Sequence, residues 1–235
     1  MPYIKDRSGE NLFWYFSDYK KAIEKHRESL MGADLSDLNL QGINLAGGRL
    51  ERADLSGSNL KRGHFEDATF RYAYLIGTDL SSSTIQSNTV NFTQVDAKRA
   101  SFNDSHFLRS DFSEGNFIGA DFAGCILTGS TFHRSNLNQT AMYSCSLGEC
   151  SFLNATLVQA RLNSSLISGA RFDEADLRWA LVQMCGPITG SFKNTVMYCA
   201  SFQGTILPKG VREDPKKPEE PLRLSRFDRI APQEP

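Results

Sequence analysis

A five-residue repeat running from Ala33 to Leu207 is the feature that most constrains the fold of this chain. In each unit a small residue comes first, a polar residue second, a large apolar residue third, and two mostly polar residues follow, as in Ala33–Asp37, Ala53–Gly57 and Ala120–Gly124. We call the large apolar residue the centre. Centres fall every five residues from position 35 to 85, slip by two at Asn88–Thr89, and resume from 92 to 207, which gives thirty-five units.

A period of five matches neither an α-helix, with about 3.6 residues per turn, nor a β-strand, with a period of 2. The chain must therefore turn by a fixed amount in each unit so that the small residue and the centre always point inward. Units of this kind bury their apolar side only by stacking on one another. The repeat predicts an all-β solenoid.

A second period, of twenty residues, predicts how many units make one coil. The phenylalanine centres at this spacing are Phe92, Phe112, Phe132, Phe152, Phe172 and Phe192. Twenty residues are four units, so the sequence predicts a four-sided coil with a phenylalanine ladder on one wall, each stacked pair worth about 0.5–1.5 kcal/mol. Phe70 extends the ladder if Asn88–Thr89 forms a bulge at a corner.

The ends of the chain lack the repeat and divide it into three parts. Residues 1–30 contain the apolar cluster Leu12–Phe16, and then Ser17 or Asp18 as an N-cap for a short helix. We expect this segment to be a helical cap on the first coil of a β-helix that spans residues 31–207. Residues 208–235 combine prolines with charges and are expected to form an extended tail.

Composition bears on location and partners. The chain has 26 Lys and Arg against 27 Asp and Glu, a balance that does not favour direct nucleic-acid binding. Four of its five cysteines, Cys125, Cys145, Cys150 and Cys185, occupy the small inward position, which indicates core residues in a reducing cytoplasm. We see neither a signal peptide nor a stretch long enough to cross a membrane, so a cytoplasmic protein without a membrane partner is expected.

Catalytic signatures are absent from the sequence. It contains no P-loop, nucleophile elbow, HExxH or CxxC motif. His64 and His106 share a wall but lie two coils apart, roughly 10 Å, which is too far to ligate one metal ion. A filled rod with flat walls also offers no pocket for a catalytic dyad. We therefore expect no enzyme activity, no cofactor and no metal.

Tandem units of the form A(D/N)LXX resemble the pentapeptide repeat family, and the resemblance covers about three quarters of the chain. It implies a right-handed, four-sided (quadrilateral) parallel β-helix. Some members of the family resemble B-DNA in size, shape and charge, bind DNA gyrase or topoisomerase IV in place of DNA, and confer quinolone resistance. The resemblance thus implies a DNA-mimic function on a type II topoisomerase. This chain lacks the long loops of such members, and prolines break the tail where those proteins dimerise through a helix, so a monomer and a homodimer both stay open.

Charge tests the DNA-mimic hypothesis. Residues 31–207 contain sixteen acidic and thirteen basic side chains, whereas about 40 Å of duplex carries roughly 24 negative charges. An acidic strip on two adjoining walls is the candidate surface. Its aspartates are Asp34, Asp54, Asp79, Asp96, Asp104 and Asp121. The alternative is an ordinary soluble surface of both signs.

A second candidate surface lies in the last coils, where apolar residues occupy outward positions. Its members named as partner-binding candidates are Trp179, Leu181, Met184 and Tyr198. Exposed apolar patches usually mark contact surfaces, but the C-terminal tail could instead fold back over this one. The alternative function is therefore a scaffold or effector that binds another protein through this patch. A third is a structural rod within a larger assembly.

Overall fold

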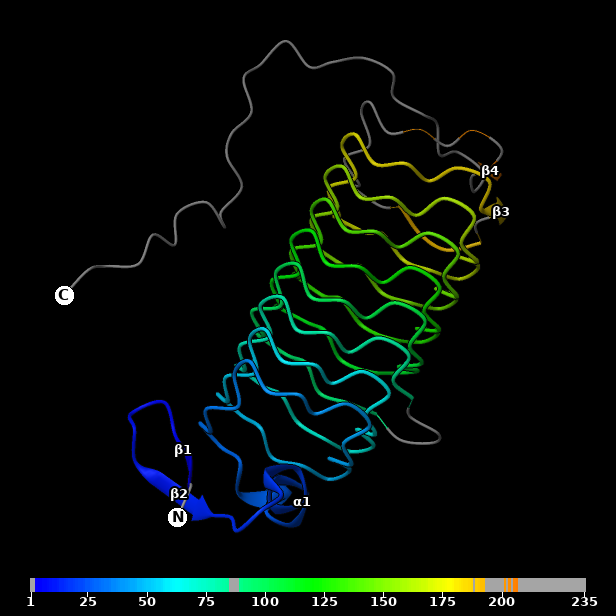
Figure 1. Ribbon diagram of the computed structural model, residues 1–235. Helices are drawn as coiled ribbons and strands as arrows, with labels where there is room; N and C mark the ends of the chain where they lie inside the picture. The colour runs from blue at the N-terminus through cyan, green and yellow to red at the C-terminus, as the bar shows by residue number, and fades with distance from the viewer. Residues whose placement is uncertain are drawn as a thin grey trace, which may run out of the picture.

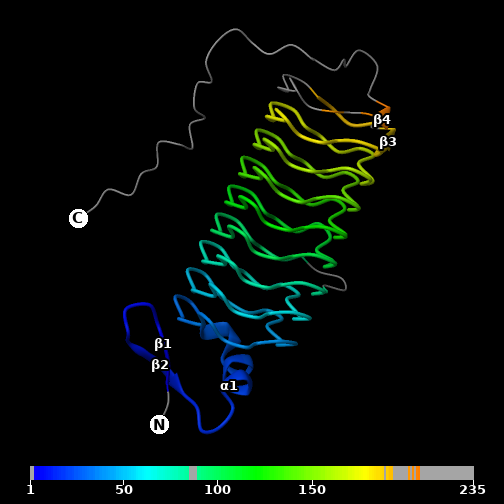
Figure 2. The same cartoon turned by 45° about the horizontal axis from the view of Figure 1, so that its top comes forward.

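The computed structural model describes residues 3–84, 89–187, 189–192, 201, 203 and 205–206, and it is a rod of stacked coils (Figure 1). At its N-terminal end lie β1 (Tyr3–Lys5), β2 (Asn11–Trp14), α1 (Tyr19–Lys25) and the 3₁₀ turn η1 (Arg27–Ser29). Two short parallel strands, β3 (Gly186–Pro187) and β4 (Thr205–Ile206), pair near the other end. Seen from a second direction, the coils stack in regular layers along one axis (Figure 2).

Each coil consists of four units, as the twenty-residue period predicts. The outward residue before each centre pairs in parallel with the residue twenty positions later, for example Asp34 with Asp54. The spacing widens to 22 between Thr69 and Asn91, and it returns to twenty at Asp111. The two extra residues therefore leave the register of the walls undisturbed. Residues 85–88 lie outside the described part of the chain.

The hydrogen bonds of one unit explain its sequence. The N–H of a centre donates to the following coil and the N–H before it donates to the preceding coil, as Leu35 does to Asp54 and Asp54 does to Ala33. The N–H of the small residue closes a turn onto the previous centre, as Ala53 does to Leu50 (3.0 Å). The two mostly polar residues after each centre form the corner. The second of them commonly has a positive φ, as in Arg52 (62°), which the second central residue of a type II turn requires. The N–H of the first corner residue takes part in none of these backbone hydrogen bonds.

The side chain of the residue before the centre satisfies that remaining N–H. Asp34 Oδ1 accepts from the N–H of Ser36 (3.2 Å), and Asn59 Oδ1 accepts from that of Lys61 (3.1 Å). Aspartate and asparagine are the residues that form such turns, because their short side chains reach the N–H two residues later. The preference for Asp or Asn in the repeat thus has a structural cause that is independent of charge.

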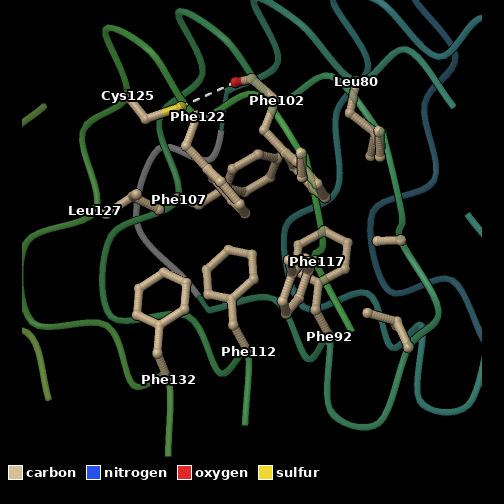
Figure 3. Packing of buried hydrophobic residues seen from close by; sticks show 14 of the residues in the cluster. Leu80, Phe92, Phe102, Phe107, Phe112, Phe117, Phe122, Cys125, Leu127 and Phe132 are labelled. Carbon is tan, nitrogen blue, oxygen red and sulfur yellow. Dashed lines mark hydrogen bonds between the residues drawn. The ribbon is translucent and has the colours of Figure 1, made fainter. Parts of the chain in front are cut away.

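The core is a column of centres, of which many in the middle coils are phenylalanine (Figure 3). The sequence-predicted ladder is present, with adjacent rings stacked at centroid distances of 4.8–5.1 Å from Phe70 to Phe192. Phe70 stacks directly on Phe92, so the ladder continues across the two-residue insertion. Beside it, Phe102 stacks on Phe122 at 4.6 Å. Small polar residues complete the interior by bonding to the coil before them, as Cys125 does to the carbonyl of Phe102 (Figure 3).

The segment before the repeat lies across the first coil, where α1 and its neighbours meet the open edge. Asp18 accepts from the N–H of Lys21 at the start of α1, and Ile23 is fully buried. Side chains of this segment take the place of a preceding coil. Glu24 accepts from the N–H of Asn44 (2.9 Å), and Arg27 donates to the carbonyl of Ala46 (2.7 Å). These bonds occupy backbone groups that would otherwise form an unpaired edge.

The hairpin formed by β1 and β2 was not anticipated from the sequence. β1 and β2 are antiparallel, and Lys5 accepts from the N–H of Asp34, so the hairpin is joined to the first wall. The apolar cluster Leu12–Phe16 was expected to help cover the first coil. Only its alternate residues Phe13 and Tyr15 pack against the core, because the strand sends the others to its opposite face.

Candidate protein-binding surface

The four walls of the rod differ in the charge of their outward residues. We number the walls by these columns: wall 1 runs from Asp34 to Asp176, wall 2 from Asn39 to Ser201, wall 3 from Asn44 to Leu166, and wall 4 from Arg49 to Ser191. Seven aspartates occupy the columns, four on wall 1, two on wall 2 and one on wall 4. The carboxylates therefore collect on two adjoining walls, although asparagine would close the same turns.

The structure places five of the six proposed acidic residues in these columns. Asp34, Asp54 and Asp96 lie on wall 1, and Asp79 and Asp121 lie on wall 2. Asp104 lies instead at the corner that ends wall 2, in the left-handed conformation (φ 56°). Wall 1, wall 2 and this corner together form one face of the rod, which we call the acidic face.

Cations within the chain neutralise part of the acidic face. Lys98 Nζ lies 3.2 Å from Asp96 Oδ2, and Arg178 is paired with Asp176. Arg7, from the turn between β1 and β2, lies 3.9 Å from Asp54 Oδ2 and also covers the ring of Tyr74, which stands between Asp54 and Asp96 in the column. Surface pairs of this kind contribute about 0–1 kcal/mol each, so their effect is mainly on local charge.

The apolar candidates continue the same face toward the C-terminal end. Leu181 lies in the column of wall 2 and is 38% exposed. Trp179 and Met184 lie at the two corners that border wall 2, in the left-handed conformation, with 45% and 68% of their surfaces exposed. Tyr198 falls outside the described residues. The structure thus brings both proposed surfaces to walls 1 and 2, which the sequence had left as separate features.

Buried thiols and one histidine–serine contact are the groups in the described part that resemble reactive sites. Burial raises the pKa of the Cys145 and Cys150 thiols to about 12, so both are held as unreactive thiols. Cys125 and Cys145 are free rather than bonded to each other. His133 Nε2 lies 2.8 Å from Ser151 Oγ on wall 4. This contact repeats a pattern between neighbouring coils, as between Gln183 and Ser201, and is one of the links between them.

Neither a metal-binding cluster nor a membrane-spanning helix occurs among the residues that the structure describes. Within them, no three side chains of His, Cys, Asp or Glu are grouped closely enough to hold a metal ion. No helix in the same part of the chain combines the length and the apolar character needed to cross a bilayer.

Comparisons with solved structures return other pentapeptide repeat proteins. HetL of the cyanobacterium Nostoc, involved in heterocyst differentiation, is 19% identical over 76% of this chain and 88% of its own, with a TM-score of 0.37. A trypsin-treated variant of QnrB1, a plasmid-mediated fluoroquinolone resistance protein, is 19% identical over 75% and 90%, with a TM-score of 0.42. An Arabidopsis thaliana thylakoid-lumen protein is 18% identical over 61% and 71%, with a TM-score of 0.30. No curated protein sequence matches.

The family assignment rests on the repeat itself rather than on these distant structures. The model of the pentapeptide repeats matches eight copies, at residues 29–62, 49–86, 91–129, 105–142 and 145–181. These segments cover more than half of the chain. The chain belongs to the pentapeptide repeat family, whose fold is a right-handed β-helix.

Proposed function

We propose that this protein is a non-enzymatic, cytoplasmic, protein-binding rod whose acidic face occupies the DNA-binding groove of a type II topoisomerase, most specifically DNA gyrase. Proteins of this family are generally structural or binding proteins. The observation that carries the proposal is the distribution of charge: six of the seven aspartates in the outward columns lie on walls 1 and 2. In this account the segment before the repeat serves as the cap that ends the rod.

The density of charge on the acidic face supports a partial likeness to DNA. The candidates from Asp34 to Asp121 span five coils, or four rises of about 4.8 Å, which is roughly 19 Å. A duplex of that length carries about 11 phosphate charges. Six carboxylates therefore reach about half the density of DNA on one face, before the cations of the same stretch are counted, which are Arg7, Lys61, Arg62, Lys98 and Arg99. With these cations counted the face is of mixed sign, so the proposal rests on the carboxylates of the two columns, which a groove lined by Lys and Arg would meet along walls 1 and 2.

A supercoiling assay with purified gyrase, with and without a quinolone, tests the proposal. The key variant replaces all six aspartates of the acidic face by asparagine, which keeps the turn bonds and removes the charge. If each exposed charge contributes about 0.2–1 kcal/mol to the complex, the six together amount to roughly 1–6 kcal/mol, and inhibition should weaken by about fivefold or more.

A matched control removes the same number of charges elsewhere on the rod. It converts six carboxylates of walls 3 and 4 and their corners to the corresponding amides: Glu66, Asp67, Asp111, Glu114, Glu149 and Glu174. The control should inhibit gyrase as well as the wild type does. Equal loss in both variants would show that net charge rather than the acidic face matters. If the wild type neither inhibits nor protects gyrase at micromolar concentration, the proposal is refuted.

A second candidate function is favoured by the exposed apolar residues of the last coils. There the rod would act as a scaffold that binds a different partner protein through Trp179, Leu181 and Met184. Trp179→Ala should weaken that complex while leaving gyrase inhibition and the fold unchanged. Removing residues 212–235 distinguishes a true interface from a patch that the tail covers, since only in the second case does Trp179 fluorescence shift toward that of an exposed indole.

A further inference from the structure

The N-terminal hairpin is apolar on both of its faces. Along β2 and the residues after it, exposure alternates: Phe13 and Tyr15 pack against the core, whereas Leu12, Trp14 and Phe16 point away from it and are 37%, 54% and 85% exposed. Strands with one face in water normally carry polar residues on that face. A strand that is apolar on both sides is typical of one that is covered on both sides.

Tyr3 extends this outer face onto β1. It is paired in register with Trp14 and is 43% exposed, whereas the next pair, Ile4 and Phe13, turns inward. We call Tyr3, Leu12, Trp14 and Phe16 the outer aromatic face. β1 and β2, which carry these residues, lie at the end of the rod opposite to β3 and β4 (Figure 1).

β2 also leaves one edge open. The hairpin sheet has the order β1–β2, and the chain following β1 pairs with the first coil through Asp6 and Ala33. Within the described residues, no third strand lies on the other edge of β2. A two-stranded hairpin is only marginally stable alone, and a flat apolar edge is a template for pairing with another chain.

A shallow groove of about 620 Å³ borders the open edge. It is lined by the residues from Leu12 to Asp18 together with one side of α1, which presents Lys21, Lys25 and His26. Phe13 stacks on His26 at 4.5 Å and so fixes the floor of the groove. The groove is therefore held in shape by the packing of the hairpin against α1.

We propose that the outer aromatic face and the edge of β2 form a homodimer interface, in which β2 pairs antiparallel with β2 of a second copy. The result is a four-stranded sheet built about a two-fold axis, with the same surface used twice. Keeping the outward residues of both copies on a common face places Leu12 opposite Trp14 or Phe16 of the other copy. Each copy thus pairs the open edge of β2 in the other copy and covers part of its outer aromatic face.

The small size of this surface indicates a weak dimer. An aromatic side chain buries about 150–250 Å², so the exposed fractions of the outer aromatic face amount to roughly 400 Å² per chain. That is about half of the 800 Å² that each partner contributes to a standard interface. Backbone bonds between the two β2 strands add to it. The expected complex is a concentration-dependent dimer with a dissociation constant on the order of 10 µM.

Charge favours a second copy over the tail of the same chain as the occupant. Residues 3–30 carry six basic and five acidic side chains, so two copies of this segment repel each other little. Around its apolar residues the tail carries Arg223, Arg226 and Arg229 against the single acid Asp228, and these arginines would approach Lys21 and Lys25 beside the groove. Repulsion between these like charges disfavours the tail as the occupant of the groove.

Sedimentation velocity of the full chain over a concentration series of about 1–100 µM tests the dimer. The wild type should approach twice the 26.2 kDa of one chain at the upper end. Trp14→Lys and Phe16→Lys should each weaken association by at least tenfold, while circular dichroism confirms that the rod stays folded. The chain has two tryptophans, so Trp179→Lys is the matched control, and it should dimerise like the wild type.

A second readout uses the fluorescence of Trp14, which is the sole tryptophan in the Trp179→Phe variant. Its emission should shift to the blue as the concentration rises through the dissociation constant. A wild type that stays monomeric at 100 µM overturns the proposal, and so does a dimer that Trp179→Lys abolishes. A blue-shifted emission that is independent of concentration and turns red when residues 208–235 are removed would assign the face to the tail instead.

Discussion

Replacing Phe112 by leucine tests whether aromatic contacts, rather than burial alone, hold the rod together. Phe112 is fully buried and contacts six other rings. Two of these, Phe92 and Phe132, stack on it at 5.1 and 4.8 Å. The other four meet it edge to face at 5.7–6.2 Å: Phe102, Phe107, Phe117 and Phe122. Leucine keeps most of the buried apolar surface but removes every ring contact.

The same substitution at Phe152 separates the two kinds of contact. Phe152 lies in the same ladder, is equally buried, and stacks on Phe132 and Phe172 at 5.1 and 4.8 Å, with no edge contact to another ring in the described core. At about 0.5–1.5 kcal/mol per pair, Phe152→Leu should lose about 1–3 kcal/mol from its two stacked pairs. Phe112→Leu should lose about 2–4 kcal/mol more, which is less than the sum of four edge pairs because neighbouring contacts are not additive.

Urea denaturation of the wild type and both variants, followed by circular dichroism, measures this difference. The two losses in free energy of unfolding should differ by at least about 2 kcal/mol. Equal losses would refute the reasoning, because they would mean that the rings act only as apolar volume and that the cluster of coils beside the insertion has no special stability.

Two further predictions concern the small inward positions. Burial raises the pKa of Cys145 and Cys150 from 9.0 to about 12, so the folded state holds these protons more tightly than the unfolded chain and stability should fall as the pH rises from about 9 to 12. Replacing both cysteines by serine should flatten this decline in urea denaturation, and an unchanged slope would contradict the assignment. A Cβ at Gly63 would lie 2.3 Å from Cζ of Phe65, so Gly63→Ala should cost about 1–3 kcal/mol. Phe65→Leu should reduce that cost in a double-mutant cycle, and an undiminished cost would show that the ring is not the obstacle.

Most of the rod could be predicted from the sequence, because one repeated unit determines it. The centres set which side faces inward, and the twenty-residue spacing of Phe92 and Phe112 predicts their stacking and the four-sided coil. Phe70 was expected to extend the ladder if the insertion at Asn88–Thr89 forms a bulge at a corner, and the ladder does continue from Phe70 to Phe92. Regular register makes such predictions reliable, since each contact is repeated by the next coil.

The N-terminal segment could be predicted less well, since nothing repeats there. Exposure alternates along Leu12–Phe16 with a period of two. Every residue of this run is apolar, so the sequence does not show that alternation. Pairing between β1 and β2 depends on a turn and on contact with the first coil through Asp34, and neither is visible in the local sequence.

The candidate surface was predicted in part. The column positions of Asp34, Asp54 and Asp96 follow from the period, but the cations that pair with them do not. Arg7 reaches Asp54 and Tyr74 from outside the repeat, and its position depends on the hairpin. Likewise Trp179, which was assigned to an outward position, is 45% exposed at a corner with a positive φ, and only the turn geometry reveals that conformation.

The claim that the acidic face takes the place of DNA is tested most directly by competition for gyrase. A fluorescently labelled duplex bound to purified gyrase is titrated with the protein, and anisotropy reports its release. The wild type and the walls 3 and 4 amide control should displace the duplex, and the variant with asparagine at the six aspartates of the acidic face should not. Binding of the protein to gyrase with the duplex still in place would contradict the account.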